Sequence, residues 1–312
     1  MGNRIYYAIQ QLGIGKDNGD DTTVIHGLQS LRLNTGFNDE PVISWGNLAI
    51  DSLLENSYEI SLEISKVLDG FTPIYLLATS GVTGITLQER AMSRCSLSMS
   101  TFDDSLTSAT GIPLSVLQCT GLYVSSLSYV FDANSNFGET VGFVGNHKKW
   151  GGTFNGQFDN TGYPTGVGGV NRRENLIFGA TGYNTTILPT EIHSGEHLSN
   201  ITISANIGRE IIPSWGEKTP FYCPPIFPIE TTTEISVIAT SGYNIGTPTG
   251  YCSGFDGNFS QSIRVATCEG TCIDMGTGNK LVGIGYGGGD AGGGNVRTTY
   301  TYKGYNDLTV TH

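Results

Sequence analysis

The residues of this 312-residue chain that could do chemistry are few, and the clearest set lies between positions 193 and 197. His193-Ser-Gly-Glu196-His197 matches the H-x-x-E-H pattern of one class of zinc peptidases. Both imidazoles of that pattern reach one zinc ion only on a helix, because residues four apart then share a face. The central glycine and the nearby Pro189 disfavour a helix here. We therefore interpret the segment as a polar loop leading into a strand and predict no metal site.

Acidic pairs and a glycine-rich stretch are further places where chemistry could be sought. Asp20-Asp21 and Asp103-Asp104 could be the two carboxylates of a glycosidase, but their polar, turn-like context favours solvated loop residues. The stretch 283–295 lacks the Gly-Lys-Ser/Thr of a phosphate loop and the repeated nonapeptides of a calcium-binding repeat. It is typical of a hairpin tip. No catalytic residue, no cofactor and no enzyme activity is predicted.

The six cysteines, at positions 95, 119, 223, 252, 268 and 272, do not form a metal-binding pattern. Cys268 and Cys272 are separated by three residues, and no second Cys/His pair at finger spacing completes a zinc site. A chain of this length made in a cytosol does not need disulfides. We expect reduced, partly buried thiols, and the sequence leaves open whether any of them pair.

Composition sets the class of fold and the class of partner. Only 14% of the residues are charged and 44 are glycine, which is typical of an all-β protein with many turns. The formal net charge is −12 and the chain has only 16 Lys and Arg residues, so a nucleic-acid groove is not expected. The first residues lack the features of a signal peptide, and no apolar stretch approaches the ~20 residues of a membrane span. We expect a soluble protein without a membrane anchor.

Apolar and polar residues alternate with the strand period of two in several segments. Residues 58–67 and 94–101 show it clearly, and Ile201/Ile203 and Ile235/Val237 show it further along the chain. Residues 85–93 are the only fair helix candidate, whereas residues 255–262 offer at most a short turn. The predicted fold is all-β with minor α: two tandem related antiparallel β-sandwich or barrel domains from an internal duplication.

The duplication is predicted from three aligned blocks in the same order. Residues 28–46 align without a gap on 198–216 at an offset of 170, including Ser-Trp-Gly around Trp45 and Trp215. Residues 63–65 align with 234–236 at an offset of 171, and residues 121–129 align with 278–286 at an offset of 157. The two tryptophans could stack on sugar rings, but their matching contexts favour a shared packing role. The predicted domains are residues 1–160 and 161–312, joined by a glycine-rich connector at 146–169.

Four segments of this chain resemble virion structural proteins of tailed bacteriophages. They are RIYYA at 4–8, EISLEISKVLDG at 59–70, NIGREIIPSWG at 206–216 and GNKLVGIGYGGGDAGGGNVRTTYTY at 278–302. The duplicated layout is similar to tail tube proteins in which two tube domains are fused in one chain. The resemblance spans almost the whole chain, but its motifs are structural.

That resemblance implies a tail tube subunit that self-assembles into stacked rings, with trimeric rings of pseudo-six-fold symmetry. The implied partners are copies of itself and other tail proteins, which can include a sheath, in a virion tail assembled in the host cytoplasm. DNA would pass through the channel without specific binding. Because acidic walls repel phosphates, we expect a wall of Asp, Glu and neutral polar side chains, with basic residues at subunit interfaces or outside. The alternatives are a capsid decoration or baseplate hub protein and a carbohydrate-binding β-sandwich.

Overall fold

The structure, a computed structural model, describes residues 10–17, 23–37, 39–46, 48–55, 59–103, 112–151, 169–178, 192, 197–216, 220, 222–239, 262–288 and 294–312. Within these ranges the chain forms antiparallel strands and two short α-helices, which confirms the predicted all-β class with minor α content. No helix in these ranges has the length and apolar character to cross a membrane.

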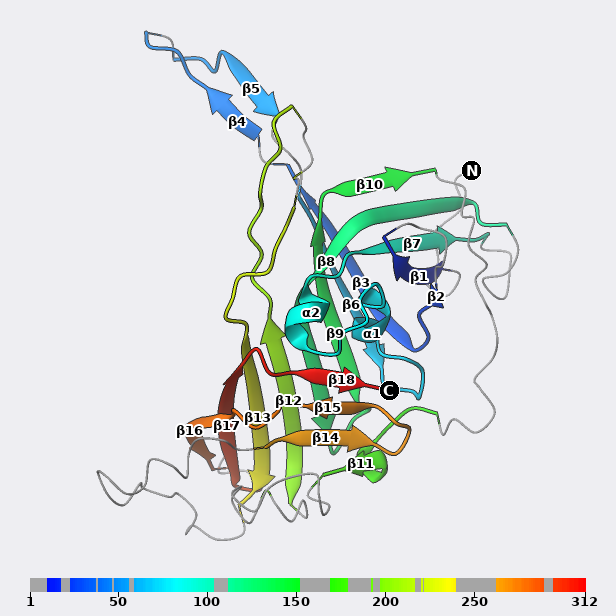
Figure 1. Cartoon of the computed structure of the whole chain (residues 1–312), viewed down its shortest axis with the longest axis vertical. Coiled ribbons are helices and arrows are strands. Elements are labelled where there is room, and N and C mark those ends of the chain that lie inside the picture. Colours follow the sequence, from blue (N-terminus) through cyan, green and yellow to red (C-terminus); the bar gives the residue numbers. More distant parts are fainter. Residues whose placement is uncertain are drawn as a thin grey trace.

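Eight antiparallel strands lie side by side and form the long sheet of the molecule (Figure 1). Their spatial order is β16 (Lys280–Gly287), β17 (Arg297–Tyr305), β13 (Glu230–Ile238), β12 (Leu198–Asn206), β8 (Ser115–Asp132), β9 (Gly138–Gly145), β6 (Glu59–Val67) and β3 (Leu28–Gly36). Because β12 pairs with β8, the predicted domains 1–160 and 161–312 are joined by main-chain hydrogen bonds within one sheet.

Shorter strands build the layers that cover this sheet. The first half of β8 curves away and pairs with β7 (Cys95–Thr101) and β10 (His147–Trp150), and β7 continues to β1 (Gln10–Lys16) and β2 (Thr23–Val24). A separate four-stranded sheet contains β11 (Leu176–Ile177), β14 (Arg264–Thr267), β15 (Cys272–Asp274) and β18 (Thr309–Thr311), and a 3-10 turn at Arg173–Asn175 precedes it. A third, two-stranded sheet contains β4 (Asp39–Val42) and β5 (Ser52–Glu55).

Alternation along the strands of the long sheet separates a buried face from a polar one. In β12, Ile201, Ile203 and Ala205 are buried, whereas Thr202 and Ser204 on the opposite face stay partly exposed. The buried face joins side chains of the covering layers in a single apolar cluster that contains residues of both halves of the chain. The other face of the long sheet is left without a covering layer of described residues (Figure 1).

The two halves of the long sheet have the same strand order and the same irregularities. β3–β6–β9–β8 and β12–β13–β17–β16 both place the fourth strand in chain order between the second and the third. A register shift follows Leu28 in the β3–β6 pair and recurs after Leu198, its partner in the first aligned block. Another follows Val124 in the β8–β9 pair and recurs after Leu281, its partner in the third block. Such bulges are specific local features, and these recur at positions that the predicted alignment pairs.

The two helices are short and are fixed by side chains at their first turns. Helix α2 (Leu87–Ala91) begins with a capping box, in which the Thr86 hydroxyl accepts from the Glu89 N–H and the Glu89 carboxylate accepts from the Thr86 N–H. This confirms the helix expected within residues 85–93. Helix α1 (Ile74–Ala78) was not expected, because its five residues are all apolar and show no difference between two faces.

The structure corrects the predicted connector at 146–169. Its first residues form β10, which pairs with β8 from Leu117 to Thr120, because His147–Trp150 contains neither glycine nor proline. Residues 152–168 of that connector, 289–293 of the glycine-rich stretch and 255–261 of the weak helix segment lie outside the described residues.

Candidate functional site

Two long excursions leave the same end of the long sheet. The first, between β3 and β6, contains the β4–β5 hairpin, and the second, between β12 and β13, contains the isolated bridges Arg209–Pro225 and Ile212–Tyr222. We call residues 37–55 the first arm and residues 207–229 the second arm. Figure 1 shows β4 and β5 projecting far beyond the rest of the fold, with the second arm extending toward the same end.

The arms expose apolar side chains, and each has a tryptophan at an outward turn. Trp45 is 105% exposed and Trp215 is 102% exposed, and the glycine after each has a positive φ, 86° at Gly46 and 82° at Gly216. The other large apolar side chains exposed on the arms include Val42, Ile43, Leu48, Ile50, Leu53 and Leu54 on the first and Ile211, Ile212, Ile226 and Phe227 on the second. The tryptophans were expected to share a packing role, and neither side chain packs on the described part of this chain, because both are fully exposed.

The uncovered face of the long sheet is polar, and we call it the polar face. It carries mainly small hydroxyl side chains along adjacent strands: Ser61, Ser65, Ser126, Ser128, Thr140, Thr202, Ser204, Thr232, Ser236, Thr299 and Thr301. Hydroxyl pairs bridge neighbouring strands at matching places in the two halves. Ser65 Oγ lies 3.0 Å from Thr140 Oγ1, and Ser236 Oγ lies 2.9 Å from Thr299 Oγ1. Those four hydroxyls bond to one another in pairs across neighbouring strands.

Charges on the polar face are sorted by strand. The carboxylates of Glu59, Glu63, Asp132, Glu230 and Glu234 lie on β6, β8 and β13. The basic residues Arg32, Lys280, Arg297 and Lys303 lie on β3, β16 and β17, toward the two edges. Lys303 donates to Glu230 over 2.6 Å, and that hydrogen bond raises the pKa of the lysine. The basic residues thus lie on the outer strands, and the central strands β12, β8 and β9 are mainly neutral polar with Asp132. Glu59 and Glu63 on β6 lie as close to an edge of the sheet as the basic residues of β17.

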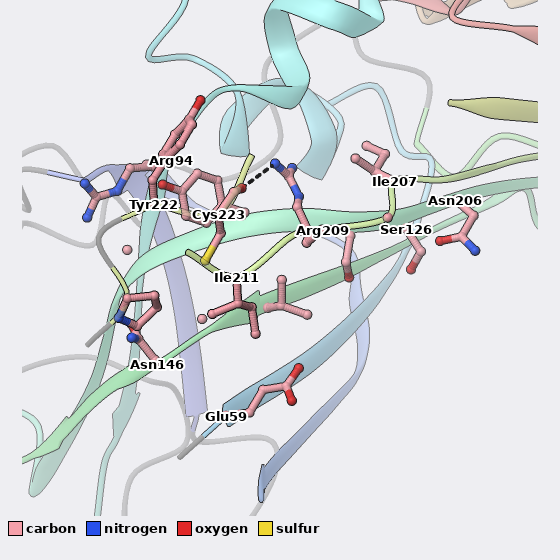
Figure 2. A pocket seen from close by; sticks show the side chains of 17 residues that line it. Glu59, Arg94, Ser126, Asn146, Asn206, Ile207, Arg209, Ile211, Tyr222 and Cys223 are labelled. Atoms are coloured by element: carbon pink, nitrogen blue, oxygen red, sulfur yellow. Dashed lines mark hydrogen bonds between the residues drawn. The ribbon is translucent and has the colours of Figure 1, made fainter. Parts of the chain in front are cut away.

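A cavity of about 460 Å³ lies where the second arm crosses β8 (Figure 2). Its wall contains Arg94, Arg209, Tyr222 and Cys223, and Glu59 lies at a distance from them on the opposite side. Burial raises the pKa of the Cys223 thiol, which keeps it protonated and poorly nucleophilic at neutral pH. No histidine is among the described residues of the wall. Among the described residues of the wall, no base therefore lies beside the Cys223 thiol.

Arg209 connects the second arm to β8. Its Nε and one terminal nitrogen donate to the Val124 carbonyl over 3.1 and 2.5 Å, and its other terminal nitrogen donates to the Cys223 carbonyl over 3.2 Å. The guanidinium also lies 5.0 Å from the centre of the Tyr123 ring. Burial lowers its pKa to about 10, so it stays charged at neutral pH. This set of contacts holds the arm in place and has the character of a structural joint.

A second buried polar cluster surrounds Glu139 in β9. Its carboxylate accepts from the backbone N–H groups of Ile74 and Tyr75 over 2.6 and 3.0 Å and from the Tyr129 hydroxyl over 2.9 Å. Burial raises the pKa of this carboxyl, although those donors and the charge of Lys66 oppose the shift. Since two of these bonds fix the start of α1 to β9 and the third joins β8 to β9, we assign the cluster a structural role.

The described residues that the sequence offered as candidates for catalysis or metal binding do not lie together in one site. His197 lies in the turn before β12, whereas 193–196 lie outside the described residues, as do Asp20-Asp21 and Asp104. Five cysteines, Cys95, Cys119, Cys223, Cys268 and Cys272, are free thiols. No group of three or more possible metal ligands occurs in the described part of the chain. Arg209 and Glu139 were missed because some of their partners, Val124 and Ile74, are 85 and 65 residues away in sequence.

No protein-family model and no curated protein matches the sequence. Solved structures show a low similarity. They include a chain of the anti-feeding prophage baseplate (TM-score 0.35, 11% identity, 48% of this chain and 97% of that one) and one of the sheath–tube complex of an extracellular contractile injection system (0.35, 11%, 47% and 90%). A chain of the anti-feeding prophage tube-terminating cap is similar at a TM-score of 0.33 and 12% identity, over 49% of this chain and 93% of that one.

Proposed function

We propose that this chain is a structural subunit of a phage-like tail, and specifically a tail tube subunit that assembles with copies of itself into stacked rings around a channel. The observation that carries the proposal is the pair of apolar arms that project from one end of the fold. A soluble chain rarely exposes such contiguous apolar surface unless another molecule covers it.

In this assembly each arm tip would pack on a neighbouring copy. Two equivalent arms on one chain suit a ring of repeated units, because head-to-tail contacts between identical surfaces continue until the ring closes. Trp45 and Trp215 would then be the main contacts, since buried aromatic side chains contribute most to protein interfaces.

The polar face would line the channel. Short hydroxyl side chains carry no positive charge that would hold phosphates, and the carboxylates on β6, β8 and β13 repel them. With the basic residues toward the edges, this face matches the expected wall of acidic and neutral polar groups. DNA would pass without being held.

Negative-stain electron microscopy of the purified full-length chain tests the proposal. Long hollow tubes are the expected result. Single rings that never stack would favour a baseplate or decoration role. Monomers that bind glycan arrays through the exposed tryptophans would refute the proposal in favour of a carbohydrate-binding protein.

Two substitutions examine the role of the arms directly. Trp45→Ser and Trp215→Ser should each abolish or strongly shorten the tubes while leaving the thermal unfolding temperature of the unassembled chain unchanged. Ile112→Ser is the matched control, because Ile112 is also highly exposed but lies outside both arms. Tubes of normal length from both tryptophan variants would show that the arms do not make the contacts.

A further inference from the structure

The long sheet ends in two long edge strands whose usual protection is confined to a register shift near one end and one basic residue each, Arg32 and Lys280. Within the described residues β3 pairs only with β6, and β16 pairs only with β17. Both strands are long, with 9 and 8 residues, and neither contains proline. Proteins normally shorten, bend or charge such edges to prevent pairing with another chain. Here each edge has a nearly complete set of main-chain donors and acceptors to offer.

The chain already contains the contact that these edges would make. β3 is the counterpart of β12 and β16 is the counterpart of β8, both by strand order and by the alignment of the two halves. β12 and β8 are antiparallel partners at the joint between the two halves. The first strand of one half therefore pairs with the third strand of the other half inside the molecule. The same two types of strand are the ones left at its outer edges.

Residues of the edge strands β16 and β3 are more exposed than their counterparts on β8 and β12, as expected if a neighbouring strand is missing at each edge. Tyr129 on β8 is fully buried at 0% exposure, whereas its counterpart Tyr286 on β16 is 54% exposed. On the other strand Ile203 is buried, whereas its counterpart Leu33 is only partly buried. The side chains that the internal joint buries thus have counterparts at the outer edges that are more exposed.

We propose that β16 of one molecule pairs antiparallel with β3 of the next, in the register of the internal β8–β12 joint. That joint places Ile203 opposite Tyr129. The counterpart of Ile203 is Leu33, at the offset of 170, and the counterpart of Tyr129 is Tyr286, at the offset of 157. The same register therefore places Leu33 opposite Tyr286 of the neighbouring molecule. Asn34 then lies opposite Gly285, with both on the polar face, and each further residue follows in antiparallel order. This inference rests on the proposed self-assembly and names the strands that carry it.

The register can be tested with cysteine pairs on the polar face. Asn34→Cys with Gly285→Cys places two thiols directly opposite each other across the proposed contact, at Cβ separations of roughly 4.5–5.5 Å. A Cβ at Gly285 meets only Thr299, at 3.9 Å, so the sheet accepts it. Within one molecule the two positions lie at opposite edges of the long sheet, so a disulfide can form only between molecules.

The matched control shifts one cysteine along the same strand and the same face. Asn34→Cys with Gly287→Cys places the second thiol diagonally, at roughly 7–8 Å between strands, and a Cβ at Gly287 meets nothing within 4 Å. Both pairs are made in a Cys268→Ser background, because Cys268 is exposed. Assembled samples are oxidised mildly, run on non-reducing gels, and the linked peptides are identified by mass spectrometry.

The expected result is a ladder of linked chains for the first pair, at least about tenfold stronger than for the shifted pair. If rings form, the ladder stops at the number of chains in one ring, which also tests the expected trimer. Assemblies visible by electron microscopy without this link, or with equal links from both pairs, would overturn the register and leave the proposed function standing. Monomers from the unsubstituted chain would overturn both.

Discussion

Replacing Arg209 by methionine tests whether the joint between the two halves depends on its side-chain contacts. The substitution keeps an unbranched stem but removes donors to two carbonyl groups, those of Val124 and Cys223, and the contact with the Tyr123 ring. A hydrogen bond from a charged donor contributes about 1.5–3 kcal/mol. Allowing for the partial exposure of the side chain, we expect a loss of about 2–4 kcal/mol in the free energy of unfolding.

Thermal unfolding and hydrogen exchange together measure this effect. For a chain of this size each kcal/mol corresponds to about 2 °C, so the unfolding temperature should fall by about 4–8 °C. Exchange should also become faster at the Ile207 and Ile226 amides, which bond to the carbonyls of Ser125 and Gly208 over 2.8 Å each. Hydrogen exchange would detect local opening of the second arm even if the rest of the chain stays folded.

Arg94→Met is the matched control for this prediction. Arg94 approaches the same Tyr123 ring at 5.9 Å, but its side chain is 50% exposed and its ion pair with Asp17, at 3.0 Å, lies near the surface. Its loss should cost less than about 1 kcal/mol. Equal effects from the two substitutions, or unchanged exchange in the second arm of the Arg209 variant, would refute the reasoning.

Two further predictions concern charge. Because burial raises the pKa of Glu139, the folded chain binds that proton more tightly than the unfolded chain does. The free energy of unfolding should therefore fall as pH rises from the ordinary pKa of the carboxyl to the raised one. Glu139→Gln should remove this part of the pH dependence, measured by urea unfolding at a series of pH values, and an unchanged dependence would contradict the prediction. The double variant Glu63→Lys/Glu234→Lys should make assembled tubes retain DNA in a salt-dependent way. The control Glu174→Lys, outside the polar face, should not. If neither variant or both variants retain DNA, the polar face does not contact DNA.

The strands were predictable from sequence because their side chains alternate strictly. β6 was expected at 58–67 and lies at Glu59–Val67, and β7 was expected at 94–101 and lies at Cys95–Thr101. β10 was missed, because its four residues, His, two Lys and Trp, show no apolar alternation and are flanked by glycines. A strand of that kind forms only because β8 offers an edge, and the edge is a property of the fold.

The exposure of the arms was not predictable from residue types. Residues such as Ile43, Leu53 and Ile212 are as apolar as the core residues of the strands, so composition suggests burial for all of them. Only the position of the arms, beyond the end of the sheet, leaves them open. The contacts of Arg209 were hidden for a related reason, since its partners include main-chain carbonyls and leave no side-chain pattern.

The alignment of the two halves also indicates that the internal and external joints are not equivalent. In the ungapped first block Asp39 is the counterpart of Arg209. An aspartate cannot donate to the carbonyl groups that Arg209 contacts, so the same bonds cannot form at the edge of β3. The internal joint combines strand pairing, a covalent connection and the Arg209 contacts, whereas the proposed joint between molecules would rely on strand pairing and the arms. Fusion of two units in one chain would thus fix half of the joints in advance and leave the weaker half to assembly.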